Sequence, residues 1–131
     1  MKKVAFICVH NSCRSQMAEA FGKALAGDVF ESFSAGSEIK GEVNPDAVRI
    51  MKERFGIDMS DHNQKTIDEI PVPDIAISMG CGVHCPYIGR GFDEDWALSD
   101  PTGKDDAEFI KTAKKIRENI LRLKSELCES K

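Results

Sequence analysis

In the first thirty residues, a short apolar run is followed directly by a tight loop and then by a helix-forming segment. The run, residues 4–7, reads Val-Ala-Phe-Ile, and the helix-forming segment covers residues 16–26. A short apolar run bounded by turn residues predicts a buried strand, so the chain opens on a strand, a loop and a helix. Apolar strands and amphipathic helical segments then alternate along the chain, which is typical of an α/β fold with a parallel sheet.

We expect a single domain over residues 1–131, because this length is sufficient for one core covered on two faces. The predicted architecture is a four-stranded parallel sheet with helices on both faces. Strands are predicted near residues 3–9, 29–35, 74–79 and 96–98, and helices near residues 15–26, 45–55 and 105–128. The acidic cluster at residues 93–95 is predicted to be a loop. In the last helix, spacing of three and four predicts a buried stripe of Ile110, Ala113, Ile116, Ile120, Leu123 and Leu127, opposite exposed Lys111, Lys114, Lys115 and Glu118.

The loop at residues 8–15 reads Cys-Val-His-Asn-Ser-Cys-Arg-Ser. Backbone N–H groups at a helix N-terminus have no partner within the helix and bind anions. We therefore expect a tetrahedral oxyanion here, with Cys8 as a nucleophilic thiolate and Arg14 holding two oxygens through its planar guanidinium. The alternative is a buried structural Cys8 and a surface Arg14. The expected oxyanion-binding residues are Val9, His10, Asn11, Ser12, Cys13, Arg14 and Ser15.

Two other residues of this loop have roles that depend on backbone geometry. Ser15 can donate a hydrogen bond to the Cys8 thiolate, or it can cap the helix. Asn11 tolerates left-handed backbone better than most residues, which suits the sharp bend that an N–H cradle requires.

A second loop, after the apolar strand predicted at residues 74–79, carries Cys81, His84 and Cys85. Two thiols in a glycine-bearing loop can receive electrons by serial thiol–disulfide exchange. A zinc site and two inert thiols are the alternatives; zinc is disfavoured because no second ligand pair with matching spacing follows.

These loops, with residues 95–101 and Gly103, resemble a known enzyme family. Together with residues 34–36 and 43–45 they make the chain similar, over nearly its whole length, to the thioredoxin-coupled arsenate reductases on the low-molecular-weight tyrosine phosphatase fold. The resemblance implies that Cys8 attacks arsenate and that Cys81 then attacks the Cys8 sulfur to release arsenite. It further implies that Cys85 bonds to Cys81, and that thioredoxin reduces this final disulfide without any cofactor. Phosphate and sulfate are expected as competing oxyanions.

The same resemblance makes Asp100 the general acid that protonates the departing oxygen. From the sequence alone, Asp100 and Pro101 also form an ordinary helix start, with the aspartate as N-cap and the proline at the first helical position. Both roles are compatible.

The chain departs from the family pattern in three places. His10 stands where many relatives carry Gly, and we expect its side chain to fill the loop facing solvent rather than to act on Cys8 as a cation. Potassium-binding relatives use residues that match Asn11, Glu19 and Ser34, with an Asp where this chain has Lys65, so the Lys65 ammonium is expected to replace the cation. Cys81 and Cys85 are also closer together than in the best-known members, which leaves another thiol donor open.

Two other functions compete with arsenate reduction. A low-molecular-weight protein tyrosine phosphatase would use Cys8, Arg14 and Asp100 alone, although Thr102 and Gly103 stand where that family supplies aromatic side chains. A non-enzymatic oxyanion-binding or redox-sensing module is the other alternative.

Bulk composition is consistent with an intracellular enzyme. A net charge of -4 and a pI near 5.4 argue against general binding to nucleic acids or anionic membranes. The first apolar run is too short for a secretory signal, and no other run approaches a membrane span. Five cysteines, four of them in two loops, favour catalytic thiols in a reducing cytosol. We therefore expect a cytoplasmic monomer.

Overall fold

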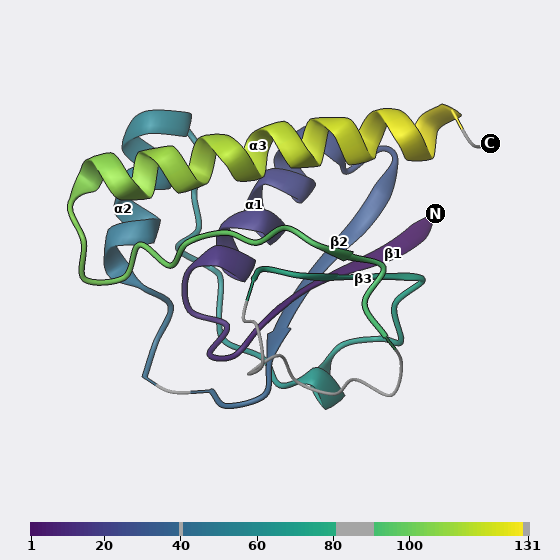
Figure 1. Ribbon diagram of the computed structural model, residues 1–131, viewed down its shortest axis with the longest axis horizontal. Helices are drawn as coiled ribbons and strands as arrows, with labels where there is room; N and C mark the ends of the chain where they lie inside the picture. The colour runs from purple at the N-terminus through teal and green to yellow at the C-terminus, as the bar shows by residue number, and fades with distance from the viewer. Residues whose placement is uncertain (40, 81–90, 130–131) are drawn as a thin grey trace.

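A four-stranded parallel sheet forms the centre of the computed structural model, which describes residues 1–39, 41–80 and 91–129 (Figure 1). The strands are β1 (Lys2–Cys8), β2 (Phe30–Gly36), β3 (Ile75–Ser78) and β4 (Glu94–Asp95), in the order β2-β1-β3-β4. Each neighbouring pair is parallel. The predicted α/β class and parallel sheet are therefore confirmed.

The prediction for the fourth strand is wrong. Glu94 and Asp95 form β4, whereas residues 96–98 were predicted as the strand and the acidic cluster as a loop. The Trp96 and Leu98 N–H groups still donate to the carbonyls of Ser78 and Met79, at 2.9 and 3.2 Å. Ala97 adopts φ +48°, a left-handed conformation that interrupts the extended backbone. Regular pairing therefore stops before the predicted segment.

The helices are α1 (Arg14–Ala26), α2 (Pro45–Phe55) and α3 (Asp106–Glu129), with a single 3₁₀ turn, η1 (Ile67–Glu69). The bounds of α2 match the prediction because local signals fix both ends. The Asn44 side chain accepts hydrogen bonds from the N–H groups of Asp46 and Ala47, and Gly56 ends the helix at φ +68°.

The two faces of the sheet are covered unequally. Alternate residues of β1, such as Val4 and Phe6, pack in one large core with α1, α2 and α3. Ala5 and Ile7 point the other way into a smaller cluster that Ile67 of η1 contacts. Figure 1 shows the three α-helices on one side of the sheet and η1 on the other. Among the described residues, the helical cover of the second face of the sheet therefore consists of the short turn η1.

Helix α3 packs through the predicted stripe. Ala113, Ile116, Ile120 and Leu123 are buried, Ile110 and Leu127 are partly buried against the core, and the four predicted charges are exposed. Phe109 joins the buried face in addition. None of the helices in the described ranges combines the length and apolar character that crossing a membrane requires.

The carboxyl ends of the strands meet at one edge of the sheet. Cys8 at the end of β1 pairs with Gly36 at the end of β2, and Ile7 pairs with Ser78 at the end of β3. In open parallel sheets this edge is where ligands bind. The Cys8 loop and the segment that leads to Asp100 both leave the sheet here.

Candidate active site

The loop between β1 and α1 is held from outside through its carbonyl groups. Five consecutive carbonyl oxygens accept hydrogen bonds: Val9 from Glu38 N (2.9 Å), His10 from Gln64 Nε2 (3.1 Å), Asn11 from Gln16 Nε2 (3.1 Å), Ser12 from Asn44 N (2.8 Å) and Cys13 from Met17 N (2.9 Å). With these carbonyls engaged, the N–H groups are the backbone polar groups left for a ligand in the loop. Asn11 has φ +54°, so its predicted left-handed conformation is confirmed.

Gly36 allows β2 to end against this loop. A Cβ atom at position 36 would lie 2.6 Å from the Val9 carbonyl oxygen and 2.9 Å from the Asn11 nitrogen. The Gly36 N–H donates to the Lys65 carbonyl at 2.9 Å, which fixes the other side of the strand end. The loop therefore packs too closely on β2 for any larger residue.

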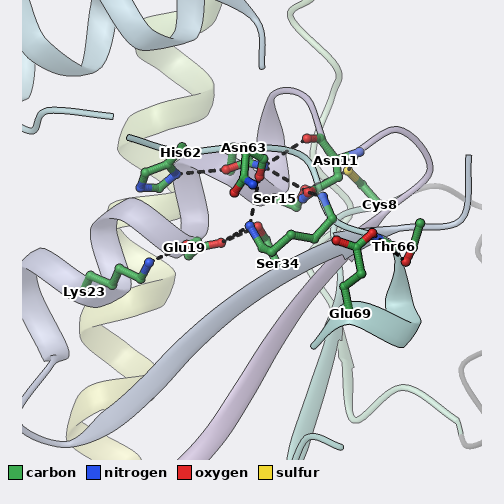
Figure 2. A network of polar contacts seen from close by, with 12 residues as sticks. Cys8, Asn11, Ser15, Glu19, Lys23, Ser34, His62, Asn63, Thr66 and Glu69 are labelled. Atoms are coloured by element: carbon green, nitrogen blue, oxygen red, sulfur yellow. Dashed lines mark hydrogen bonds and ion pairs between the residues drawn. The ribbon is translucent and has the colours of Figure 1, made fainter. Parts of the chain in front are cut away.

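Hydrogen-bond donors point at the sulfur of Cys8. The Asn11 N–H donates to Sγ at 3.1 Å, and the Ser15 hydroxyl lies 2.8 Å from the same sulfur. Because Asn11 Nδ2 donates to Ser15 Oγ at 2.9 Å, the hydroxyl keeps its own hydrogen for Sγ. Figure 2 shows these three side chains together. Two hydrogen-bond donors therefore converge on one buried sulfur.

The side chain of Asn11 is in turn held by a network that the sequence did not reveal. Asn11 Oδ1 accepts from the Lys65 N–H at 2.8 Å and from Gln16 Nε2 at 2.9 Å, and Gln16 Oε1 lies 2.9 Å from His62 Nδ1 (Figure 2). Burial lowers the pKa of His62, so the ring is neutral near pH 7. Its Nδ1 carries the proton, because the facing amide oxygen can only accept.

Arg14 begins α1 and reaches the far rim of the site. Its Nη1 donates to the carbonyl oxygens of Met79 (3.0 Å) and Leu98 (2.9 Å), which fixes the plane of the guanidinium. No hydrogen bond from the described residues engages the Nε–Nη2 edge, which can make a two-point contact with an oxyanion. Arg14 thus ties α1 to the segments that follow β3 and β4.

Asp100 lies beside Arg14, with its Oδ2 3.9 Å from Arg14 Nη2. The Thr102 N–H and hydroxyl donate to Asp100 Oδ1 at 3.0 and 2.7 Å. Burial alone would raise the pKa of Asp100, but the hydrogen bonds from Thr102 and the charge of Arg14 outweigh it and hold the pKa below its usual value. The carboxyl is therefore ionised in the resting site.

Cys13 differs from Cys8 although both are in the same loop. Burial, reinforced by the Asp100 carboxylate, raises the pKa of the Cys13 thiol to about 12. Cys13 therefore remains a neutral thiol at physiological pH and is a poor nucleophile.

Both capping alternatives are wrong. Ser15 lies inside the first turn of α1 and bonds to Cys8, and the residue preceding that helix, Cys13, makes no side-chain cap. Helix α3 begins only at Asp106, where Asp105 accepts the Glu108 N–H at 3.2 Å. Asp100 is five residues too early to cap it.

The residues expected to form a cation site come together behind the loop. Lys65 Nζ lies 3.3 Å from Glu19 Oε1, and Lys23 Nζ lies 2.6 Å from Glu19 Oε2. The Ser34 hydroxyl donates to Glu19 (Figure 2). The Glu19 side chain is 5% exposed. Burial alone would raise the pKa of Glu19, but the hydrogen bonds from Lys23 and Ser34 and the charge of Lys65 lower it.

A cavity opens over the Cys8 sulfur. Its described lining consists of Cys8, Val9, His10, Ser12, Cys13, Arg14, Glu38, Gly80, Leu98, Ser99, Asp100 and Thr102. The structure thus brings together three predicted catalytic residues, Cys8, Arg14 and Asp100. Cys81 and Cys85, with the alternative zinc ligand His84, lie outside the described residues, but Gly80 immediately precedes Cys81 in the chain.

A cysteine in a backbone N–H cradle, an arginine and an aspartate at the carboxyl edge of a parallel sheet suit nucleophilic chemistry on a tetrahedral oxyanion. A family model described as "Low molecular weight phosphotyrosine protein phosphatase" matches residues 3–131. The chain therefore belongs to the low molecular weight phosphotyrosine protein phosphatase family.

Its relatives place it among particular members of that family. Arsenate reductase 1 of Staphylococcus epidermidis is 42% identical over 124 residues, which cover 91% of this chain and 92% of that protein. The solved structure of an arsenate reductase in the phosphate binding state superposes with a TM-score of 0.85 at 37% identity, covering 97% of this chain and 99% of that one. A thioredoxin-dependent arsenate reductase from Corynebacterium glutamicum has a TM-score of 0.78 at 36% identity, covering 100% and 64% of the two chains.

Proposed function

We propose that this protein reduces arsenate to arsenite by a thiol relay that begins at Cys8, and that thioredoxin restores the reduced enzyme. The main support for this proposal is the position of the Cys8 sulfur, which lies at the cavity with two hydrogen-bond donors and with Arg14 and Asp100 nearby. The arsenate reductases among its relatives, at up to 42% identity in the comparisons above, support the choice of substrate. We expect the protein to act as a monomer in the cytoplasm, where reductants are available.

In the first step, the Cys8 thiolate attacks arsenic, so a sulfur–arsenic bond forms and an arsenic–oxygen bond breaks. The loop N–H groups and the free edge of Arg14 bind the remaining oxygens. Asp100 protonates the departing oxygen, which leaves as water. Its carboxylate is ionised at rest, but a bound oxyanion raises the pKa of a neighbouring carboxyl by repulsion. Asp100 therefore takes up its proton as the substrate binds.

In the second step, the Cys81 thiolate attacks the Cys8 sulfur. A Cys8–Cys81 disulfide forms, the sulfur–arsenic bond breaks, and its electron pair stays on arsenic, which becomes arsenite. Cys85 then attacks Cys81, frees Cys8 and leaves a Cys81–Cys85 disulfide that the thioredoxin dithiol reduces. The thioredoxin-dependent relative from Corynebacterium glutamicum supports this reductant; a low-molecular-weight thiol is the alternative donor.

Lys65 takes the place of a bound cation in this proposal. Its ammonium contacts the Glu19 carboxylate beneath the loop, and its backbone N–H holds the Asn11 side chain. A tethered positive charge therefore stabilises the loop without a metal ion.

A protein tyrosine phosphatase is the second candidate, because phosphoryl transfer needs only Cys8, Arg14 and Asp100. The described lining of the cavity includes Thr102 and contains no Phe, Tyr or Trp side chain that could hold a phenol ring. This favours a small inorganic oxyanion over a phosphotyrosine.

The deciding experiment is arsenate turnover with thioredoxin, thioredoxin reductase and NADPH. The unmodified protein should consume NADPH only when arsenate is present, whereas Cys8→Ser should lose both this activity and any aryl phosphate hydrolysis while still binding oxyanions. A phosphatase would hydrolyse the aryl phosphate without reducing arsenate, and a redox sensor would do neither.

Single-cysteine variants separate the steps of the relay. Cys81→Ser should stop after arsenate adds to Cys8, and Cys85→Ser should accumulate a Cys8–Cys81 disulfide after one turnover, detectable by mass spectrometry of the alkylated, non-reduced protein. Aryl phosphate hydrolysis serves as the internal control and should persist in both. Sustained arsenate turnover in both variants would exclude the relay, and loss in Cys81→Ser alone would assign the last step to an external thiol.

A further inference from the structure

His10 carries an imidazole into the cavity that the proposed mechanism does not use. Its side chain is half-buried rather than facing solvent, and it lines the cavity together with Cys8 and Asp100. It also lies close enough to Asp100 for the two side chains to interact electrostatically. The loop fixes its backbone, because the His10 carbonyl accepts a hydrogen bond from Gln64.

The two ring nitrogens of His10 are in different situations. Nδ1 is buried and has no hydrogen-bond partner among the described residues. A proton on Nδ1 would be a buried donor without an acceptor, which is costly. In the neutral ring the proton therefore sits on Nε2, which becomes the donor that the side chain can offer to a ligand.

We propose that His10 binds the substrate oxyanion by donating a hydrogen bond from Nε2 to one of its oxygens. The proposal rests on the oxyanion site described above but not on the thiol relay. His10 adds a side-chain donor from the loop itself to those supplied by the backbone and by Arg14. Because the contact forms in the bound ground state and persists in the transition state, it lowers KM without changing kcat.

The test uses sulfate, an oxyanion that the enzyme cannot reduce, with binding measured by isothermal titration calorimetry at pH 7.5. His10→Leu replaces the donor by an apolar side chain of similar length, and should weaken sulfate binding about tenfold. His10→Gln places an amide N–H near the position of Nε2, and should bind sulfate nearly as well as the unmodified protein. Thermal unfolding of all three proteins establishes that each is folded.

The outcomes distinguish this inference from the proposed reductase activity. Unchanged sulfate affinity in His10→Leu, or equal loss in the Leu and Gln variants, would overturn the role of His10, since the second result indicates packing rather than donation. Arsenate kinetics give an independent reading: KM should rise about tenfold in His10→Leu with kcat retained, and a fall in kcat alone would contradict a binding role. No sulfate binding by the unmodified protein would refute the oxyanion site itself. If His10→Leu weakened sulfate binding but the unmodified protein did not turn over arsenate, only the thiol relay would be refuted.

Discussion

Replacing Gly36 by Ala adds a methyl group where β2 ends against the Cys8 loop. The new Cβ would lie 2.6 Å from the Val9 carbonyl oxygen, and ordinary contact begins near 3.4 Å, so about 0.8 Å of movement is required. The strand end cannot supply this movement easily, because Gly36 pairs with Cys8 and donates to the Lys65 carbonyl. The loop must therefore shift. Overpacking of this kind costs about 2 kcal/mol of stability, and displacing a reaction centre by close to 1 Å lowers kcat/KM roughly a hundredfold.

Urea unfolding and thioredoxin-coupled arsenate turnover measure the two effects. Gly91→Ala is the matched control, because among the described residues no atom beyond its chain neighbours lies within 4 Å of a Cβ at that position. It should leave both the unfolding free energy and turnover nearly unchanged. If Gly36→Ala kept the kcat/KM of the unmodified protein, the close contact of β2 would not determine the shape of the loop, and the reasoning from backbone proximity would fail.

Three further predictions follow from the site. Arg14→Lys keeps the positive charge but cannot hold two carbonyls and an oxyanion at once, so turnover should fall at least a hundredfold in a protein that still unfolds cooperatively; unchanged turnover would show that the planar fork is unimportant. Ser15→Ala removes a donor to the sulfur and should slow alkylation of Cys8 by iodoacetamide at pH 7 about tenfold, and an unchanged rate would remove the hydroxyl from the mechanism. The lowered pKa of Glu19 means that its ionised form stabilises the fold above the usual carboxyl range near 4.5, and that this contribution is lost as the pH falls through the lower folded value. Glu19→Gln should thus cost about 3 kcal/mol in urea unfolding at pH 7 and progressively less in acid, and a difference independent of pH would contradict the ion pairs.

The elements predicted best from the sequence are those whose signals are local. Asn44, Pro45 and Gly56 mark both ends of α2 within a few residues of the helix itself. The anion-binding character of the loop at residues 8–15 could be predicted for the same reason, because a strand, the loop and a helix follow one another without interruption.

The failed prediction of the fourth strand and the contacts that were not predicted depend on features that the hydrophobic pattern does not report. The length of β4 is set by its pairing with β3 and by the left-handed Ala97, neither of which changes the hydrophobic pattern at residues 93–98. The anchoring of Arg14 by the Met79 and Leu98 carbonyls involves backbone atoms that no side-chain pattern reports. Gln16 was missed because an uncharged polar residue near a helix start is ordinary in a sequence.

The carbonyl groups of the Cys8 loop accept hydrogen bonds from several segments of the chain, so no single segment determines the shape of its N–H cradle. Its shape depends on contacts from the chain after β2, from the residue that caps α2 and from the segment around Gln64, besides α1 itself. A partly folded chain that lacks any one of these cannot form it, so anion binding reports the completed fold. A ligand that binds only the native state stabilises it by mass action, by about 2.7 kcal/mol at a hundred times Kd. An abundant oxyanion such as phosphate would therefore both compete with the substrate and protect the protein from unfolding.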